Sequence, residues 1–247
     1  MPLALTSKIN KAFYGDEFKS FILYAPLGLG KTALAIQCLL ELYFLKDIRK
    51  AILDHGARCN VWDYIDNEKV LNMVKTHLVF HPKNFLLACR RLTERDKALL
   101  WDDAGLWLFS LDFKDPFVNA VSKFMSVART KFGAIIFTTP HPSHVIKKIR
   151  TLPDAVVVKV YKYTNSRWLR KAKHYQWWST PDGKKSGVRG KEVEKFSCHI
   201  PDFIYDWYLP LRKRYADMAL DMMQKRLDEM ELGDKFPELG KRVPAVS

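Results

Sequence analysis

The hydrophobic positions of this chain fall into short apolar runs, separated by segments in which apolar residues recur every three or four positions. This pattern indicates buried β-strands that alternate with amphipathic helices. The predicted strands span residues 21–24, 76–80, 97–101, 132–137 and 155–163. Because such alternation is typical of a sheet covered by helices on both faces, we expect an α/β fold with a mostly parallel central sheet flanked by helices.

The segments outside these strands predict the remaining elements. Helices are expected over 7–16, from Lys31 to about Leu40, twice within 47–75, and around 85–92, 117–127 and 144–149. Two extended arms, 167–179 and 188–199, flank the turn at Pro181-Asp182-Gly183 and predict a β-hairpin. Residues 201–232 predict a C-terminal amphipathic helix with Pro210 near its start. We divide the chain into a core (1–163), a basic aromatic β extension (164–200), and a C-terminal helix and tail (201–247).

The first predicted strand leads into a glycine-bearing loop and then a helix, in the segment Phe21–Ala35 (FILYAPLGLGKTALA). Strand, loop and helix in this order form the phosphate-binding P-loop. Gly28 and Gly30 let backbone N–H groups turn toward an anion, and the helix N-terminus adds its positive dipole end. Lys31 would contact the β- and γ-phosphates, and the Thr32 hydroxyl would bind Mg²⁺. The predicted nucleotide-binding residues are Gly28, Leu29, Gly30, Lys31, Thr32 and Ala33.

One position departs from the P-loop pattern G-x-x-x-x-G-K-[ST], because Ala25 stands where the first glycine is expected. Alanine lacks the freedom of glycine at positive φ. The loop must therefore begin with an ordinary backbone conformation.

Polar residues that follow two later strands predict the rest of a nucleotide site. Asp102 and Asp103 follow the apolar run 98–101, as in a Walker B motif. Asp102 would bind Mg²⁺, which prefers hard oxygen ligands, and Asp103 would position the attacking water. Thr138 and Thr139 end the next strand, where either hydroxyl could sense the γ-phosphate. Solvated loop acids and a simple strand-ending turn are the plain alternatives.

Composition and charge narrow the possible partners. The chain has 247 residues, 48% of them hydrophobic, and a net charge of +14, which favours a folded protein with a polyanionic partner. Between 146 and 195 there are fourteen Lys or Arg and four acids, interleaved with Trp and Tyr. We expect nucleic-acid contacts there, by phosphate binding and base stacking; a solvated basic face with its aromatics in the core is the alternative. The candidate contacts are Lys171, Lys173, Lys184, Lys185 and Arg189, with the loop 183–190 favoured.

These motifs together resemble the P-loop NTPases of the additional-strand class, which contains RecA-like, FtsK–HerA-like and AAA+ ATPases. The likeness covers residues 19–163, and the phrase LLWDDAG (Leu99–Gly105) also resembles small ATPases of archaeal viruses and plasmids. The resemblance implies ATP and Mg²⁺ as cofactors, a homo-oligomer, and work on DNA. Since no helical-bundle pattern follows the fifth strand, we expect a RecA-like or FtsK–HerA-like core with a β extension.

The sequence thus predicts a Mg²⁺-dependent ATPase coupled to DNA handling. The alternatives are a DNA-packaging or conjugation motor, a nucleotide-gated DNA-binding switch with little hydrolysis, and a small-molecule kinase. An arginine finger from a neighbouring subunit is expected in this class. Arg129 and Arg150 are its first candidates, with Arg167 and Arg170 also available. No apolar run reaches the ~18 residues of a membrane span, and four scattered cysteines favour a reducing, cytoplasmic location.

Overall fold

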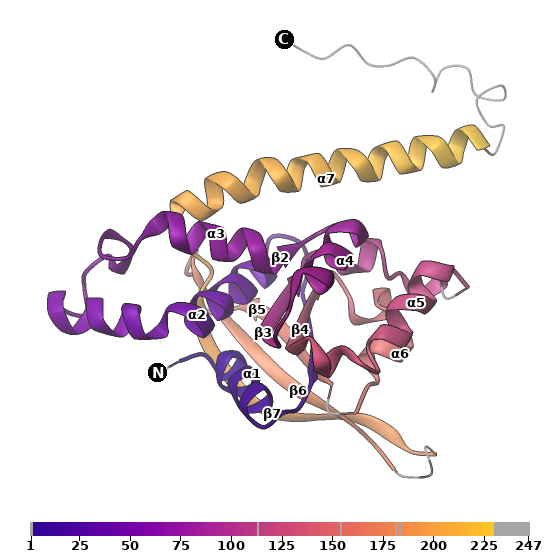
Figure 1. The fold of residues 1–247 in the computed structure, drawn as a ribbon, viewed down its shortest axis with the longest axis horizontal. Helices are drawn as coiled ribbons and strands as arrows, with labels where there is room; N and C mark the ends of the chain where they lie inside the picture. Colours follow the sequence, from indigo (N-terminus) through magenta and orange to yellow (C-terminus); the bar gives the residue numbers. More distant parts are fainter. Residues whose placement is uncertain (1, 113, 154, 181, 183, 230–247) are drawn as a thin grey trace. The chain divides into compact units, whose positions relative to one another are not determined.

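A single seven-stranded sheet is the centre of this computed structural model, which describes residues 2–112, 114–153, 155–180, 182 and 184–229 (Figure 1). The strand order is β2-β3-β4-β1-β5-β6-β7. The strands are β1 (Lys19–Tyr24), β2 (Leu78–Val79), β3 (Asp96–Trp101), β4 (Phe132–Thr139), β5 (Val156–Lys162), β6 (Leu169–Ser179) and β7 (Ser186–Ser197).

The first five strands of this sheet are parallel, and β6 and β7 add an antiparallel hairpin to its edge. In β1, the side chains of Phe21, Ile22 and Leu23 are fully buried, as expected for a parallel strand covered on both faces. The mostly parallel α/β sheet and the β-hairpin are therefore confirmed.

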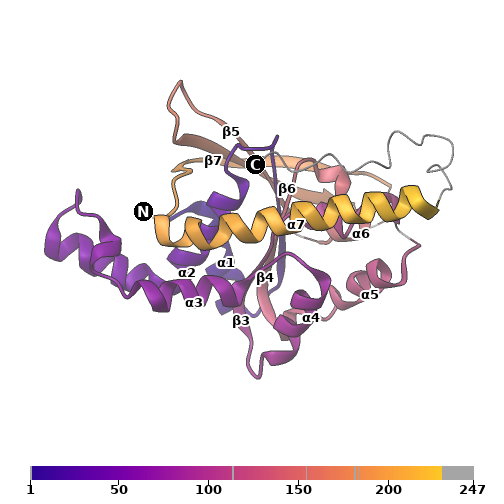
Figure 2. The same cartoon turned by 90° about the horizontal axis from the view of Figure 1, so that it is seen from above.

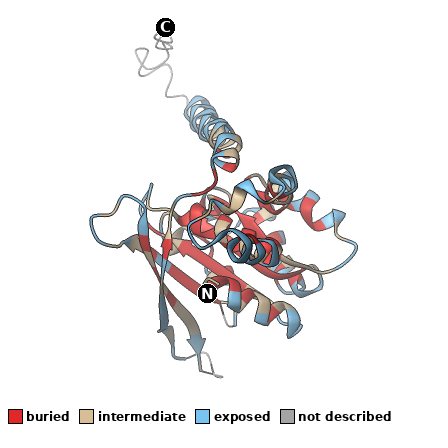
Figure 3. Ribbon diagram, turned by 90° about the vertical axis from the view of Figure 1, so that its left-hand side faces the viewer, coloured by how far each residue is buried: buried red, intermediate tan, exposed pale blue. Residues whose placement is uncertain are grey.

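Helices cover both faces of the sheet (Figure 2). They are α1 (Ala4–Tyr14), α2 (Lys31–His55), α3 (Asn67–His77), α4 (Pro82–Arg91), α5 (Pro116–Phe124) and α6 (Lys147–Arg150), and one further helix, α7 (Asp202–Glu229), follows them in the chain. Ile22, Trp101 and Phe137 belong to the hydrophobic core against which α4, α5 and α6 pack. Helices α1 and α2 pack against the opposite face. Figure 3 shows the buried residues concentrated in the central strands, whereas the distal part of the β6–β7 hairpin is exposed.

Several element boundaries differ from the prediction. Helix α2 continues unbroken to His55, so the first of the two helices expected within 47–75 is the end of α2. No glycine or proline interrupts the segment until Gly56, which explains its continuity. Strand β2 has only two residues, and α6 has four, with a 3₁₀ turn, Pro142–His144, preceding it. Strand β4 extends to Thr139, which places both threonines inside the strand.

A polar cluster anchors the start of β3 to two helices. Asp96 lies 2.8 Å from Nε2 of His77 in α3 and accepts a 2.5 Å hydrogen bond from the Tyr43 hydroxyl in α2. Burial alone would raise the pKa of the Asp96 carboxyl, but the hydrogen bond and charge of His77 hold it below the ordinary value. The strand that leads to Asp102 is therefore held at its first residue, Asp96, by a charged hydrogen-bond network.

The chain divides after Pro201 into two compact units, and the second contains α7. Pro210 lies inside α7, in its third turn, which is near the start of this long helix as expected. Proline has no N–H, so one helical hydrogen bond is missing there although the helix continues. The predicted C-terminal helix is confirmed as far as Glu229, and its expected last residues, 230–232, lie outside the described part of the chain. Among the described helices, none combines the length and apolar character that crossing a bilayer requires.

Candidate nucleotide-binding site

The loop between β1 and α2 has the geometry of an anion-binding turn. Gly28 has φ +76° and Gly30 has φ +91°, and α2 begins at the next residue, Lys31. Both glycines adopt backbone conformations that L-residues rarely take. The N–H groups of the first turn of a helix point toward its amino-terminal end, and so toward this loop.

Gly30 is also close to the end of the β6–β7 hairpin. A Cβ placed on Gly30 would lie 2.7 Å from Cβ of Cys198 and 3.9 Å from Cγ of Arg170. The strand that starts near Arg170 therefore lies directly beside the phosphate-binding loop. Glycine at this position is required both by its φ and by this close approach.

The side chain of Lys31 is folded against its own loop. Nζ donates hydrogen bonds to the carbonyl oxygens of Ala25 at 3.0 Å and Pro26 at 3.4 Å, and only 5% of the residue is exposed. Ala25 is fully buried and is not among the residues with positive φ. The loop thus begins with the ordinary backbone conformation expected from an alanine at this position.

Asp102 is the polar centre of the site. Its Oδ1 accepts one hydrogen bond from the Thr32 hydroxyl at 2.8 Å and another from the Thr138 hydroxyl at 2.5 Å. Its backbone N–H donates to the carbonyl of Val79 in β2, at 2.8 Å. The carboxylate is 1% exposed and links the ends of β3 and β4 to the first turn of α2.

Asp103 and the two threonines are distinguished by their contacts. The Asp103 backbone N–H donates to the Thr138 hydroxyl at 2.8 Å, so this hydroxyl bridges the two consecutive aspartates. Asp103 itself has φ +48°, a left-handed conformation that is uncommon outside glycine and is found most often for Asn and Asp. The Thr139 hydroxyl instead donates to the carbonyl of His141, at 3.1 Å. Thr138 therefore contacts the acidic pair, and Thr139 closes the following turn.

The residues at this point suit a magnesium ion. The Thr32 hydroxyl and the Asp102 carboxylate are hard oxygen ligands, and they already lie within hydrogen-bonding distance of each other at the phosphate loop. Mg²⁺ commonly uses one or two protein oxygens together with nucleotide phosphates and water. Within the described residues, no cluster of three His, Cys, Asp or Glu side chains forms a separate metal site.

The candidate arginines lie in different places. Arg129 contacts the carboxylate of Asp16 at 3.2 Å, and these residues precede β4 and β1 respectively. The pair therefore lies at the amino-terminal ends of these strands, whereas the phosphate loop lies at the carboxyl-terminal end of β1. Arg150 is half-buried at the end of α6. The Arg167 guanidinium lies over the ring of Trp168, 4.7 Å from its centroid. None of these three has a described contact with the phosphate loop.

Cys198 is a neighbour of the loop that sequence reasoning missed, and Arg170, an available arginine-finger candidate, is a second neighbour whose place beside the loop was not predicted. Arg170 is 6% exposed, donates to the carbonyls of Ser166 and Leu169, and its buried Nε has no hydrogen-bond partner among the described residues. Strand β5 is parallel to β1, and β6 is antiparallel to β5. The first residues of β6 therefore lie at the same end of the sheet as the last residue of β1. The predicted hairpin is the signal that could have located both residues, because an antiparallel hairpin after the fifth strand begins and ends beside the phosphate loop.

The candidate nucleic-acid contacts are divided between two faces of the hairpin. Lys171 and Lys173 lie on one face, because they alternate with the buried Ala172 and His174. Arg189 pairs with Gln176 and therefore lies on the opposite face. The two remaining candidates, Lys184 and Lys185, are exposed beside the hairpin turn. Of the favoured loop 183–190, residue 183 lies outside the described residues.

The position of the motifs in the sheet defines the class of protein. Strand β4 lies between β1, which leads into the phosphate loop, and β3, which ends at the aspartate pair. This inserted strand is the feature expected of the additional-strand class. The chain has the fold of a P-loop NTPase of that class.

Comparison with known proteins gives one relative in sequence and several distant structures. The chain is 23% identical over 244 residues to uncharacterized protein B-251 of Sulfolobus spindle-shape virus 1, an alignment covering 92% of this chain and 86% of that protein. No family model matches the sequence.

The structural neighbours include a KaiC-like protein of Pyrococcus horikoshii, with a TM-score of 0.35, 15% identity, and coverage of 69% of this chain and 88% of the other. The N-terminal domain of zonular occludens toxin from Neisseria meningitidis has a TM-score of 0.34 at 12% identity and covers 71% and 94%. A third neighbour is an ATPase domain with a TM-score of 0.34 at 11% identity, and it covers 70% and 80%. The class assignment rests on strand order and motif position rather than on these overlaps.

Proposed function

We propose that this protein is a Mg²⁺-dependent ATPase whose hydrolysis cycle is coupled to the handling of DNA. One observation carries the catalytic part of the proposal. The hydroxyls of Thr32 and Thr138 converge on a single oxygen of the buried Asp102, beside the phosphate loop. The two residues that we propose as metal ligands, Thr32 and Asp102, thus form one connected group with a polar residue of the inserted strand.

The residues of this group, together with Lys31 and Asp103, each have a proposed role. Lys31 exchanges its hydrogen bonds with Ala25 and Pro26 for the β- and γ-phosphate oxygens. Thr32 and Asp102 would hold Mg²⁺, which would supply positive charge near the transferring phosphoryl group. Asp103 orients the attacking water. Thr138, which contacts both aspartates, is favoured over Thr139 as the γ-phosphate sensor.

The coupling to DNA is supported by the basic hairpin, whose first strand begins beside the phosphate loop. A change at the loop on nucleotide binding would reach Arg170 and Cys198, and through them β6 and β7. Subunit assembly is part of the proposal because an arginine finger is supplied in trans. Arg129 and Arg150 remain its candidates, and Arg170, which lies beside Gly30, would act within the same subunit.

A nucleotide-gated switch with little hydrolysis is the second candidate. Aspartate is shorter than the glutamate that many related ATPases use to position water, and Asp103 is held in a left-handed conformation. The difference between the two candidates is therefore one of turnover rate.

Steady-state phosphate release with Mg²⁺-ATP tests the proposal, with nucleotide binding measured in parallel. We expect turnover in the wild type, its loss with EDTA, and its loss in Lys31→Ala. Asp103→Asn should bind ATP with wild-type affinity and lose turnover by about 100-fold or more. Lys83→Ala, a substitution at the amino-terminal end of α4, is the matched lysine control. ATP binding without turnover would favour the switch, and absence of ATP binding would refute both candidates.

A further inference from the structure

A pocket with aromatic walls and a basic rim lies between α6 and the strands β5, β6 and β7, apart from the nucleotide site. Its volume is about 480 Å³. Its lining includes Tyr24, Lys147, Arg150, Tyr175, Trp177 and Val188. The pocket thus combines three aromatic rings with two cationic side chains, and its described lining includes no residue of the nucleotide site.

The register of the sheet explains why these residues meet. Ile22 of β1 pairs with Val157 of β5, which pairs with Tyr175 of β6, so the three side chains lie on one face. Trp177 pairs with Val188 and lies on the same face. This is the face on which α6 packs, and α6 has only four residues. The short helix leaves the outer strands of this face open.

Lysines continue the same face beyond the pocket. Lys159 pairs with Lys173, and Tyr161 pairs with Lys171, which in turn pairs with Lys195. The Nζ atoms of Lys171 and Lys195 lie 4.0 and 4.7 Å from the ring centroid of Tyr163. The hydrogen bond and charge of Lys195, together with the charge of Lys171, lower the pKa of the Tyr163 phenol. The open face is therefore a row of ammonium groups interleaved with aromatic rings.

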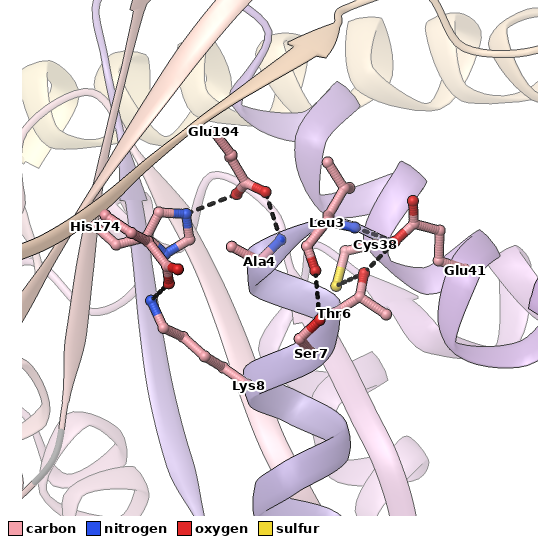
Figure 4. Close-up of polar contacts among 10 residues, drawn as sticks. Leu3, Ala4, Thr6, Ser7, Lys8, Cys38, Glu41, His174 and Glu194 are labelled. Atoms are coloured by element: carbon pink, nitrogen blue, oxygen red, sulfur yellow. Dashed lines mark hydrogen bonds and ion pairs between the residues drawn. The ribbon is translucent and has the colours of Figure 1, made fainter. Parts of the chain in front are cut away.

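The acids of β7 are directed to the other face of the sheet, where α1 covers them (Figure 4). Glu194 accepts hydrogen bonds from His174 and from the backbone N–H of Ala4, both at 2.6 Å. Glu192 forms an ion pair with Lys8 of α1. The alternation of the strand thus separates the charges, and it leaves the lysines of the open face without these carboxylates as counter-ions.

We propose that this pocket receives an unpaired base of single-stranded nucleic acid, whose backbone lies along the lysine row. The inference deepens the proposed DNA-coupled function and rests on it. Basic grooves bind the backbone of single strands, while aromatic side chains stack with bases in a sequence-tolerant way. The bases of a duplex are already paired and stacked, so a duplex offers none to such a pocket. A lipid headgroup would use the lysines but not the aromatic walls.

The pocket also contacts the ends of two strands that form the nucleotide site. Tyr24 is the last residue of β1, and the carbonyl of its neighbour Ala25 accepts the hydrogen bond from Lys31. The ring of Tyr24 lies 6.3 Å from that of His141, whose carbonyl holds the Thr139 hydroxyl. A base stacked on Tyr24 would therefore lie close to the Lys31–Ala25 and Thr139–His141 hydrogen bonds and could alter both. This arrangement provides a physical route from bound nucleic acid to the phosphate loop.

Fluorescence anisotropy with labelled dT20 tests the inference on the full chain. Trp177→Leu removes a pocket wall, and Trp178→Leu, one residue further on the opposite face, is its matched control. We expect Trp177→Leu to weaken dT20 binding by about tenfold or more, because base stacking on one aromatic is worth that order. Trp178→Leu should remain within about twofold. Lys147→Gln, beside the control Lys148→Gln, provides a second pair in which no core packing is lost.

Further probes decide the nature of the occupant. We expect rU20 to compete with dT20, a 20-base-pair duplex to compete at least tenfold less well, and phosphatidylserine vesicles not to compete. Equal binding by Trp177→Leu and wild type, or equal competition by duplex, would overturn the inference. If DNA still stimulated ATP turnover in those cases, the proposed function would survive alone. Capture by vesicles with no dT20 binding would refute both this inference and the DNA coupling.

Discussion

The Thr138 hydroxyl donates a 2.5 Å hydrogen bond to Oδ1 of Asp102, and both residues are almost fully buried. The bond joins the ends of β3 and β4, which are adjacent parallel strands. Because the same hydroxyl accepts from the Asp103 N–H, it fixes both consecutive aspartates relative to the sheet. A displacement of Thr138 by a γ-phosphate would therefore also move Asp102, the proposed metal ligand, and Asp103, the proposed water-positioning residue.

The first prediction separates the two threonines. Thr138→Val keeps the shape of the side chain and removes the hydroxyl, so we expect turnover to fall by about tenfold or more with little change in ATP affinity. Thr139→Val should reduce turnover less, since its hydroxyl contacts only the His141 carbonyl. Thr138→Ser, which keeps the hydroxyl, should retain most activity. A larger loss in Thr139→Val than in Thr138→Val would contradict this assignment.

The second prediction compares the two glycines of the loop. Gly30→Ala places a Cβ 2.7 Å from Cys198 and strains a residue with φ +91°. Gly28→Ala meets only the strain, since nothing lies within 4 Å of its added Cβ. Left-handed strain costs roughly 1–2 kcal/mol, so Gly28→Ala should lower the free energy of unfolding by about that amount and Gly30→Ala by more. Urea unfolding measures the free energy of unfolding of both variants. Equal decreases would show that the hairpin does not pack closely against the loop at Gly30.

The third prediction concerns the residue that departs from the P-loop pattern. Because Ala25 has no positive φ and is fully buried, it does not need the freedom of glycine. Ala25→Gly should leave ATP affinity within about twofold and lower stability by about 0.5–1 kcal/mol, through the extra entropy of the unfolded chain. Isothermal titration and thermal unfolding measure the two effects. A large gain in affinity would mean that alanine constrains the loop.

The fourth prediction is a pH dependence of stability. The folded protein lowers the pKa of Asp96 from 3.8, so the folded state binds this proton less tightly than the unfolded chain. The resulting stabilisation is complete above pH 3.8 and is lost as the pH falls through the lower folded value. Asp96→Asn should therefore destabilise the protein at pH 6 more than at pH 3. Asp47→Asn, at an exposed position, is the control. A difference in unfolding free energy between wild type and Asp96→Asn that is larger at pH 3 than at pH 6 would contradict the lowered pKa of Asp96.

Much of the fold could be predicted because its signals are local. The apolar runs 21–24, 97–101 and 132–137 locate three central strands, since strands buried on both faces are nearly continuous in hydrophobicity. The P-loop residues and the aspartate pair could be placed at one sheet edge because parallel strands end there together. The turn at 181–183 located the hairpin. These inferences required no knowledge of long-range packing.

The remainder depended on contacts between distant segments. Which of Thr138 and Thr139 contacts Asp102 depends on the register between β3 and β4. Two adjacent threonines in the sequence do not reveal that register. In the sequence Arg170 is one more basic residue of a charged segment, and its burial beside Gly30 follows only once β6 is folded back along β5. The pocket at Trp177 combines residues from four strands and one helix, so no single window of sequence contains it.

The central claim is that ATP hydrolysis is coupled to nucleic acid, and steady-state turnover with and without single-stranded DNA tests it most directly. At saturating Mg²⁺-ATP, we predict that dT20 raises turnover at least severalfold in the wild type. Lys31→Ala should show no turnover in either condition, and Trp177→Leu should require a higher dT20 concentration for half-maximal stimulation. Turnover that is unchanged at every concentration of single-stranded and duplex DNA would contradict the account, even if ATP were bound and hydrolysed.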